Sequence, residues 1–286
     1  MLLLWIGLFL FVITLVVLDL GVLHRHARHI SVYEALAMSV FWISLGLGFS
    51  LFVYCAYANN WLEVNTGADL SGQQALLEYL TVFTIEKTLS FDNLFVMAII
   101  FHHFRVPVIY QHRVLMLGIL GAIVLRSCFI LVGVYVLESL AWMNYVFGVL
   151  LLLATLKFIS RYMQKNATRD NLLVRLARRI LPVDETVGDG QIIKRVDGRL
   201  VATPLLITLL LVESADLMLA MDSVPAIMAI SREPFILISS NLFAILGLRA
   251  LYFVLASALQ QFHYLRLSMV VILLFVASKM LLIHIY

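Results

Sequence analysis

Two apolar stretches of the chain each carry several acidic residues inside a segment long enough to cross a bilayer. The first, EKTLSFDN, contains Glu86 and Asp92, and the second, ESADLMLAMDSVP, contains Glu213, Asp216 and Asp222. A carboxylate at mid-membrane depth costs about 2.5 to 3.5 kcal/mol on insertion scales and usually faces a bundle interior, a water-filled cavity or an ion path. The two stretches are therefore predicted to form the two halves of one site inside a helical bundle.

Composition places the chain among polytopic membrane proteins. It is 63% hydrophobic and 13% charged, whereas a soluble domain is about 45–50% apolar and about 25% charged. Eight apolar runs predict an all-α fold with eight transmembrane helices. The predicted spans are residues 2–20, 35–58, 76–101, 114–136, 141–159, 204–230, 234–259 and 265–285. In a signal peptide the basic residues precede the apolar run. Here Arg25 and Arg28 follow the first span, so this span is expected to be retained.

Lysine and arginine are distributed unequally between the predicted loops. Loops after the first, third, fifth and seventh spans hold nearly all of them, and the opposite side has only Arg232. Since basic loops stay in the cytoplasm, the segment 161–203 is predicted to be cytoplasmic and the N-terminus extracytoplasmic, in the cytoplasmic (inner) membrane. This asymmetry accounts for the net charge of +3 without a nucleic-acid partner.

The segment 161–203 is the one sizeable piece predicted to lie outside the bilayer. Residues 171–181 combine leucines with arginines at helical spacing, which is typical of an amphipathic helix lying on anionic headgroups. The run QIIKRVDGRLVAT predicts a β-hairpin with Asp197 and Gly198 at its turn. Cys55 and Cys128, the two cysteines, lie in apolar runs and indicate neither a disulfide framework nor a thiolate metal cage.

The two acidic stretches belong to a longer internal repeat. The aligned pairs are Glu86 with Asp216, Asp92 with Asp222, Arg126 with Arg249, and Lys157 with Lys279. Each half contains three spans, an odd number, so consecutive halves are predicted to be inverted in the membrane, as in many secondary transporters. The chain is thus read as one transporter domain, 1–286. It divides into two leading spans (1–75), repeat one (76–160), the cytoplasmic loop (161–203) and repeat two (204–286).

The polar residues of the repeat form a predicted cation site. The candidate metal ligands are Glu86, Asp92, Asn93, Glu213, Asp216, Asp222 and Ser223, with Ser90, Ser214, Met218 and Met221 as accessory candidates. Oxygen ligands of this kind suit Mn²⁺, Mg²⁺ or Ca²⁺ better than Zn²⁺ or Cu⁺. Pro225 is expected to distort its helix and free the Met221 carbonyl beside Asp222. Met218 and Met221 either add a softer contact to the metal or only pack in the core.

Basic residues are predicted to compensate the buried acids. Lys87, Arg126 and Arg249 lie within the spans and are expected to neutralise carboxylates, either as permanent scaffold or during a transport cycle. On this hypothesis Arg126 holds Asp92, and Arg249 holds Asp222. Lys157 and Lys279 lie near span ends, where their ammonium groups can reach the interface. Because protons compete with a metal for carboxylates, proton exchange for metal is also expected.

Several segments carry a family resemblance. IEKTLSFDNLFV, VPVIYQHRVLMLGILGAIVLR, VESADLMLAMDSVPAI and SSNLFAILGLRALYF resemble the TerC/Alx family of integral membrane proteins, long labelled tellurium resistance. The resemblance implies a helical fold like that of the LysE superfamily and efflux of divalent metal, chiefly Mn²⁺ as substrate, with no permanently bound cofactor. It implies that the intramembrane acids of the family correspond to Glu86, Asp92, Glu213, Asp216 and Asp222. Family members usually continue into a further helix after the segment that matches LFVASKMLLIHIY.

Two other function classes are open on the sequence. An intramembrane aspartyl protease also places two aspartates, here Asp92 and Asp222, on neighbouring helices. Neither lies in a Gly-x-Gly-Asp setting, and a protease does not explain the repeated basic residues, so no enzyme activity is predicted. A non-transporting scaffold for metal or tellurite resistance, or for metalation of secreted proteins, is the alternative to transport, with the basic loop as its docking segment. The sequence does not specify an oligomeric state.

Overall fold

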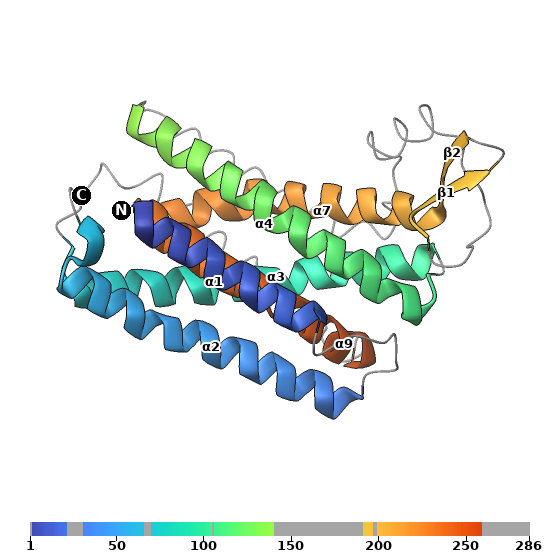
Figure 1. Cartoon of the computed structure of the whole chain (residues 1–286), viewed down its shortest axis with the longest axis horizontal. Helices are drawn as coiled ribbons and strands as arrows, with labels where there is room; N and C mark the ends of the chain where they lie inside the picture. Colours follow the sequence, from blue (N-terminus) through green and yellow to red (C-terminus); the bar gives the residue numbers. More distant parts are fainter. Residues whose placement is uncertain are drawn as a thin grey trace, which may run out of the picture.

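The computed structural model describes residues 2–21, 31–65, 70–104, 106–139, 191–196 and 199–258. The predicted fifth and eighth spans, the amphipathic segment 171–181, Lys157 and Lys279 lie outside these residues. Seven α-helices and one short 3₁₀ helix, η1 (Trp61–Glu63), occupy most of the described chain (Figure 1). The α-helices are α1 (Leu2–Gly21), α2 (Val32–Ala58), α3 (Gly72–His103), α4 (Val108–Ser139), α7 (Pro204–Met228), α8 (Pro234–Ile245) and α9 (Leu248–Ala258).

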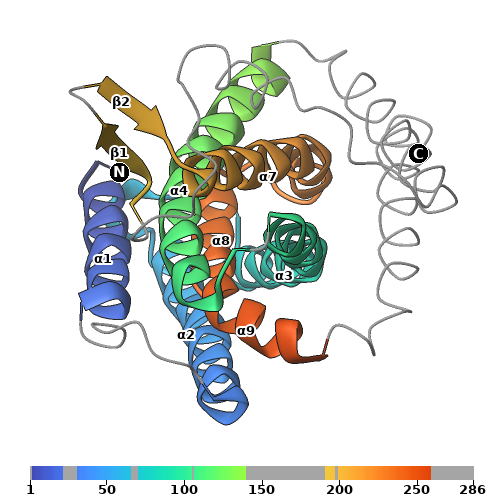
Figure 2. The same cartoon turned by 90° about the vertical axis from the view of Figure 1, so that its right-hand side faces the viewer.

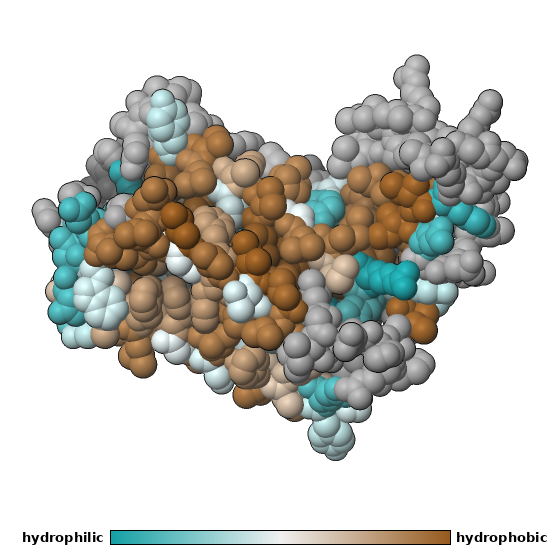
Figure 3. Space-filling view, in the orientation of Figure 1, coloured by the Kyte–Doolittle hydropathy of each residue, from teal (hydrophilic) through white to brown (hydrophobic). Residues whose placement is uncertain are grey.

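Three of these helices are long and apolar enough to cross a membrane. They are Leu2–Asp19, Val32–Ala58 and Ile109–Tyr135, and the bent pair α8 and α9 counts as a fourth if it forms one span. At about 1.5 Å per residue, α2 is about 40 Å long, more than the hydrocarbon core of about 30 Å. Figure 3 shows a surface that is mostly hydrophobic between two more hydrophilic ends. This distribution is typical of a protein surrounded by lipid.

The helices run in opposed pairs around a buried centre. Gly118 of α4 lies against Val212 of α7, and Gly133 lies against Met228, so α4 and α7 run in the same direction. Both run opposite to α3 and α8 (Figure 1). Every residue of α8 from Phe235 to Ile245 is buried, because α2, α3 and α4 enclose this helix (Figure 2).

The predicted span over residues 234–259 is wrong as a single helix. The structure divides it into α8 and α9, which meet at an angle of 42°. At the break, a Cβ atom on Gly247 would lie 2.9 Å from Cβ of Trp42 and 3.1 Å from Nζ of Lys87. The side chains of Trp42 on α2 and Lys87 on α3 thus approach Gly247 so closely that a Cβ atom there would force them to shift.

Pro225 does not interrupt its helix. We predicted a distortion of this segment, yet α7 continues as an α-helix through Pro225 to Met228. Proline still removes the amide that would bind the Met221 carbonyl, because its ring nitrogen carries no hydrogen. The missing bond is therefore accommodated inside a continuous helix, and the chain breaks instead between α8 and α9.

The predicted hairpin is confirmed. Strand β1 (Ile193–Val196) pairs antiparallel with β2 (Arg199–Ala202), and the register places Val196 opposite Arg199, which leaves Asp197 and Gly198 between the strands. The Thr203 hydroxyl donates a hydrogen bond to the Ile192 carbonyl at 2.8 Å, directly before α7 begins at Pro204. This bond fixes the hairpin to the start of α7.

Candidate functional site

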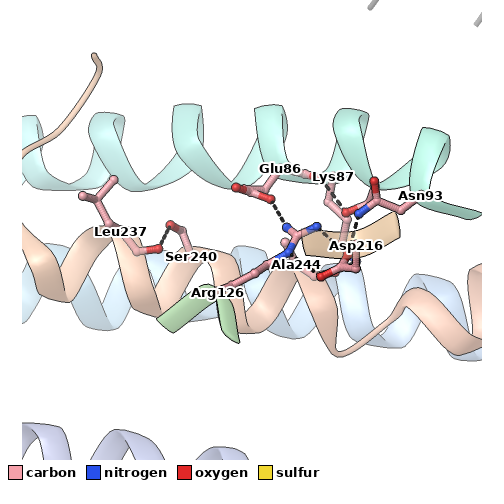
Figure 4. A network of polar contacts seen from close by, with 9 residues as sticks. Glu86, Lys87, Asn93, Arg126, Asp216, Leu237, Ser240 and Ala244 are labelled. Atoms are coloured by element: carbon pink, nitrogen blue, oxygen red, sulfur yellow. Dashed lines mark hydrogen bonds and ion pairs between the residues drawn. The ribbon is translucent and has the colours of Figure 1, made fainter. Parts of the chain in front are cut away.

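A buried cluster of ion pairs joins three helices (Figure 4). Arg126 of α4 donates from Nη1 to Oε2 of Glu86 on α3 at 2.7 Å. The same guanidinium donates from Nη2 and Nε to the two carboxylate oxygens of Asp216 on α7, at 2.9 and 3.1 Å. Asn93, on α3, adds a bond from Nδ2 to Oδ1 of Asp216 at 3.0 Å. All four residues are at most 3% exposed.

This geometry makes Arg126 the centre of the cluster. Its two-bond contact with Asp216 is the forked arrangement in which arginine binds a carboxylate most strongly. The sequence matched Arg126 with Asp92, whereas the structure shows Glu86 and Asp216 as its partners. Two carboxylates share one guanidinium, so the cluster of these three residues has a formal charge of −1.

Lys87 binds a helix end and contacts no carboxylate among the side chains that the structure describes. Its ammonium donates a hydrogen bond to the Ala244 carbonyl at 2.8 Å, in the last turn of α8. Carbonyls in the last turn of a helix lack partners within the helix and carry partial negative charge. Lys87 thus caps α8 directly before the break at Gly247, and its predicted role in compensating an acid stays a prediction.

Glu213 lies in a notch formed by two glycines of α4. A Cβ atom on Gly121 would overlap the Glu213 carboxylate, and one on Gly118 would lie 3.9 Å from Oε1. Glu213 is partly buried, and its Oε2 has no hydrogen-bond partner in the part of the chain that is described. The sequence analysis missed Gly118 and Gly121, although their spacing of three residues within an apolar span signals close helix contact.

Arg249 lies outside this cluster. It forms an ion pair with Asp19 of α1, Nη2 to Oδ1, at 2.7 Å, and Nη1 lies 3.3 Å from Nε2 of His112. The Asp19 side chain is 15% exposed, so the pair lies near an end of the bundle. The structure therefore gives Arg249 a partner from the first span, which the repeat did not indicate.

The remaining predicted ligands fall into two groups. The side chains of Asp92, Asp222, Met218 and Met221 are not described, although all four residues belong to α3 or α7. Ser90 donates to the Glu86 carbonyl of its own helix at 2.6 Å, and Ser214 and Ser223 are buried. Among the side chains that are described, no three histidine, cysteine, aspartate or glutamate residues form a metal-holding group.

Comparison with known proteins identifies a family. The model described as "Integral membrane protein TerC family" matches residues 71–286. An uncharacterized membrane protein of Myxococcus xanthus is 41% identical over 97% of this chain and 82% of its own length. "Putative membrane-bound redox modulator Alx" of Escherichia coli K12 is 38% identical over 99% of this chain and 87% of its own length. No solved structure matches the chain.

Proposed function

Since the chain belongs to the TerC family of integral membrane proteins, we propose that it exports a divalent metal cation, foremost Mn²⁺, from the cytoplasm in exchange for protons. The observation that carries the proposal is the fully buried pairing of Glu86 and Asp216 with Arg126. Buried charges inside a membrane bundle are rare and usually mark ion pathways. A scaffold that only docks partners has no need of such a cluster.

The charge balance of α3, α4 and α7 favours a divalent cation. The two acidic stretches on α3 and α7 hold five acids (Glu86, Asp92, Glu213, Asp216 and Asp222), and the bases among and beside them are Lys87 and Arg126, so these seven residues have a formal charge of −3. A divalent cation offsets two of these charges, and protons can offset them when the cation has left. The available donors are carboxylate, amide and hydroxyl oxygens, which suit Mn²⁺.

Helix directions support an inverted repeat. The helices that begin the two proposed halves, α3 and α7, run in opposite directions, and each packs on the second helix of the other half. The end of α4 and the start of α7 lie at opposite ends of the bundle (Figure 1), which agrees with the proposed fifth span over 141–159. The break between α8 and α9 adds the interrupted helix that is common at transport sites.

The two ends of the helical bundle also suggest how the protein is oriented in the membrane. The β1–β2 hairpin lies at the end of the bundle where α3 finishes and α7 begins (Figure 1). The hairpin belongs to the segment 161–203, which is rich in lysine and arginine. We place this end in the cytoplasm, because basic loops are retained there. The N-terminus of α1 then faces the outside of the inner membrane.

Redox modulation, named for the Escherichia coli relative, has less support in this chain. Cys55 and Cys128 are free thiols on separate helices, α2 and α4. Neither belongs to a Cys-x-x-Cys motif, the arrangement typical of thiol–disulfide exchange. The buried acids, in contrast, lie in the helices that the family model covers.

Transport in a purified system tests the proposal. The full chain is reconstituted in liposomes that contain a Mn²⁺-sensitive dye. We expect it to move Mn²⁺ when the proton gradient drives protons in the opposite direction. Protein-free liposomes and liposomes without a gradient are the controls. Equal Mn²⁺ movement with and without the proton gradient would reject the exchange of protons for Mn²⁺ but not Mn²⁺ export. No Mn²⁺ movement under either condition would reject export itself.

Replacing Gly121 with alanine is expected to reduce Mn²⁺ transport while the protein stays folded. The added Cβ overlaps the Glu213 carboxylate, which is the far end of a flexible side chain and can move away. Gly48→Ala is the matched control, because a Cβ on this helical glycine of α2 meets nothing within 4 Å. Both variants should unfold at the wild-type temperature or slightly above it, since alanine favours helix. Equal transport by the two variants would show that the position of Glu213 is unimportant.

A further inference from the structure

The carboxylate of Glu86 is bound by two side chains. Arg126 donates from Nη1 to its Oε2 at 2.7 Å, and Figure 4 shows the other oxygen, Oε1, pointing away from the guanidinium. The Asn241 amide, on α8, forms a second hydrogen bond with this carboxylate. Glu86 and Asn241 are 0% and 2% exposed, and neither Oε1 nor the amide nitrogen Nδ2 has another partner among the described residues. Since Oε2 binds Arg126, Oε1 is the oxygen left for the amide.

A contact one helical turn away holds α8 against α3 at this level. Lys87, the neighbour of Glu86 on α3, donates to the Ala244 carbonyl at 2.8 Å (Figure 4). Asn241 precedes Ala244 by three residues, so both lie on the same side of α8. Adjacent residues of α3 thus bind α8 at two positions, and the Lys87 contact independently supports the placement of Asn241 beside Glu86.

Asp216 is held in the same way. Its carboxylate accepts two bonds from Arg126 and one from Nδ2 of Asn93, the last at 3.0 Å. Each acid of the cluster therefore contacts the shared guanidinium and one asparagine amide. An amide is a neutral donor, so the two asparagines fix the carboxylates while Glu86, Asp216 and Arg126 keep their formal charge of −1. A lysine or arginine in place of either asparagine would cancel this charge.

We propose that Asn241 is the positioning residue of Glu86: its amide fixes the direction in which the carboxylate faces an incoming cation and leaves the negative charge in place. This inference rests on the proposed export, and it adds α8 to the helices that shape the cation path. Hydrogen bonds to a metal ligand set its orientation, and their loss typically lowers metal affinity about 10–100-fold. The sequence analysis did not single out Asn241, because α8 carries no acidic residue.

The kinetics of Mn²⁺ transport in liposomes test this role. Asn241→Ser removes the amide, and the variant is expected to fold, because the hydroxyls of Ser239 and Ser240 already bind the Ile236 carbonyl within α8. We expect its KM for Mn²⁺ to rise about tenfold while the maximal rate changes less, since a misoriented ligand weakens binding. Loss of folded protein alone would lower the maximal rate and leave KM unchanged. Ser240→Ala, the buried control on the same helix, should leave KM unchanged.

A double-mutant cycle tests the contact without metal. Glu86→Met removes the acceptor of the hydrogen bond. Asn241→Ser should raise the unfolding constant of the otherwise wild-type protein about tenfold or more, as expected for the loss of a hydrogen bond to a charged group. Its effect in the Glu86→Met protein should be much smaller, because the partner is already absent. Asn241→Leu and Glu86→Leu replace a variant that does not fold.

The outcomes separate the contact, its role and the proposed export. Equal effects of Asn241→Ser in the two backgrounds would overturn the contact. Coupling between the two positions with an unchanged KM would show that Asn241 only stabilises the fold, and would overturn its role in cation binding. No Mn²⁺ movement by the wild-type protein would instead reject export, and the cycle would still decide whether Asn241 holds Glu86.

Discussion

Replacing Arg126 with glutamine is expected to destabilise the folded protein by about 3–5 kcal/mol, the usual effect of removing one partner from a buried ion pair. The change leaves Glu86 and Asp216 buried without their shared guanidinium. The amide of glutamine cannot restore the contacts to both α3 and α7. Denaturant unfolding of the purified protein in detergent measures the loss, and reduced abundance in membranes should accompany it.

Arg232→Gln is the matched control, since Arg232 is exposed at the loop before α8. We expect this variant to stay within about 0.5 kcal/mol of wild type. Combining Arg126→Met with Glu86→Gln and Asp216→Asn should recover much of the lost stability, because no buried charge of the cluster then remains. Wild-type stability of Arg126→Gln alone would contradict the assignment of Arg126 as the structural centre.

Asp222→Asn and Asp92→Asn are expected to abolish Mn²⁺ transport in protein that still folds. Both substitutions remove a charge and keep the size of the side chain, and α7 and α3 hold these positions in the same helices as the Arg126 cluster. Asp216→Asn should behave differently and lower stability, because Asp216 accepts two bonds from Arg126. Liposome uptake and Mn²⁺ titration of each purified variant separate the two roles.

Second-site changes sharpen this contrast. The structure pairs Arg126 with Asp216, and Arg249 with Asp19, so Arg249→Gln should not restore transport to Asp222→Asn. Arg126→Gln should not restore the abundance of Asp216→Asn, since Glu86 is then buried without the guanidinium that Asp216→Asn leaves in place. Normal transport by Asp222→Asn alone would remove Asp222 from the proposed metal ligands.

Local sequence patterns predicted the helices well and their interruption poorly. The described helices begin and end within six residues of the predicted spans, because apolar runs bounded by polar loops define them directly. The break at Gly247 lies inside a run with no polar signal. It depends on the approach of Trp42 and on Lys87 binding the Ala244 carbonyl, and both residues are far from the break in sequence.

The residues of the site were easier to predict than their partners. Charges in apolar runs identified Glu86, Arg126 and Asp216 as buried, and the structure confirms their burial. Their pairing depends on the register between helices, which the repeat does not specify. The repeat equated Arg126 with Arg249, yet only Arg126 lies between α3 and α7 in the described structure.

The distances along the chain between ion-pair partners set an order for biosynthesis. Glu86 and Arg126 are separated by 40 residues, Arg126 and Asp216 by 90, and Arg249 and Asp19 by 230. As the chain leaves the ribosome, Arg126 meets Glu86 first and acquires Asp216 only when α7 is made. Asp19 enters the membrane with the first helix, whereas Arg249 is made only after nearly the whole described chain has been translated. A chain released before α9 is made therefore lacks the ion pair between Arg249 and Asp19.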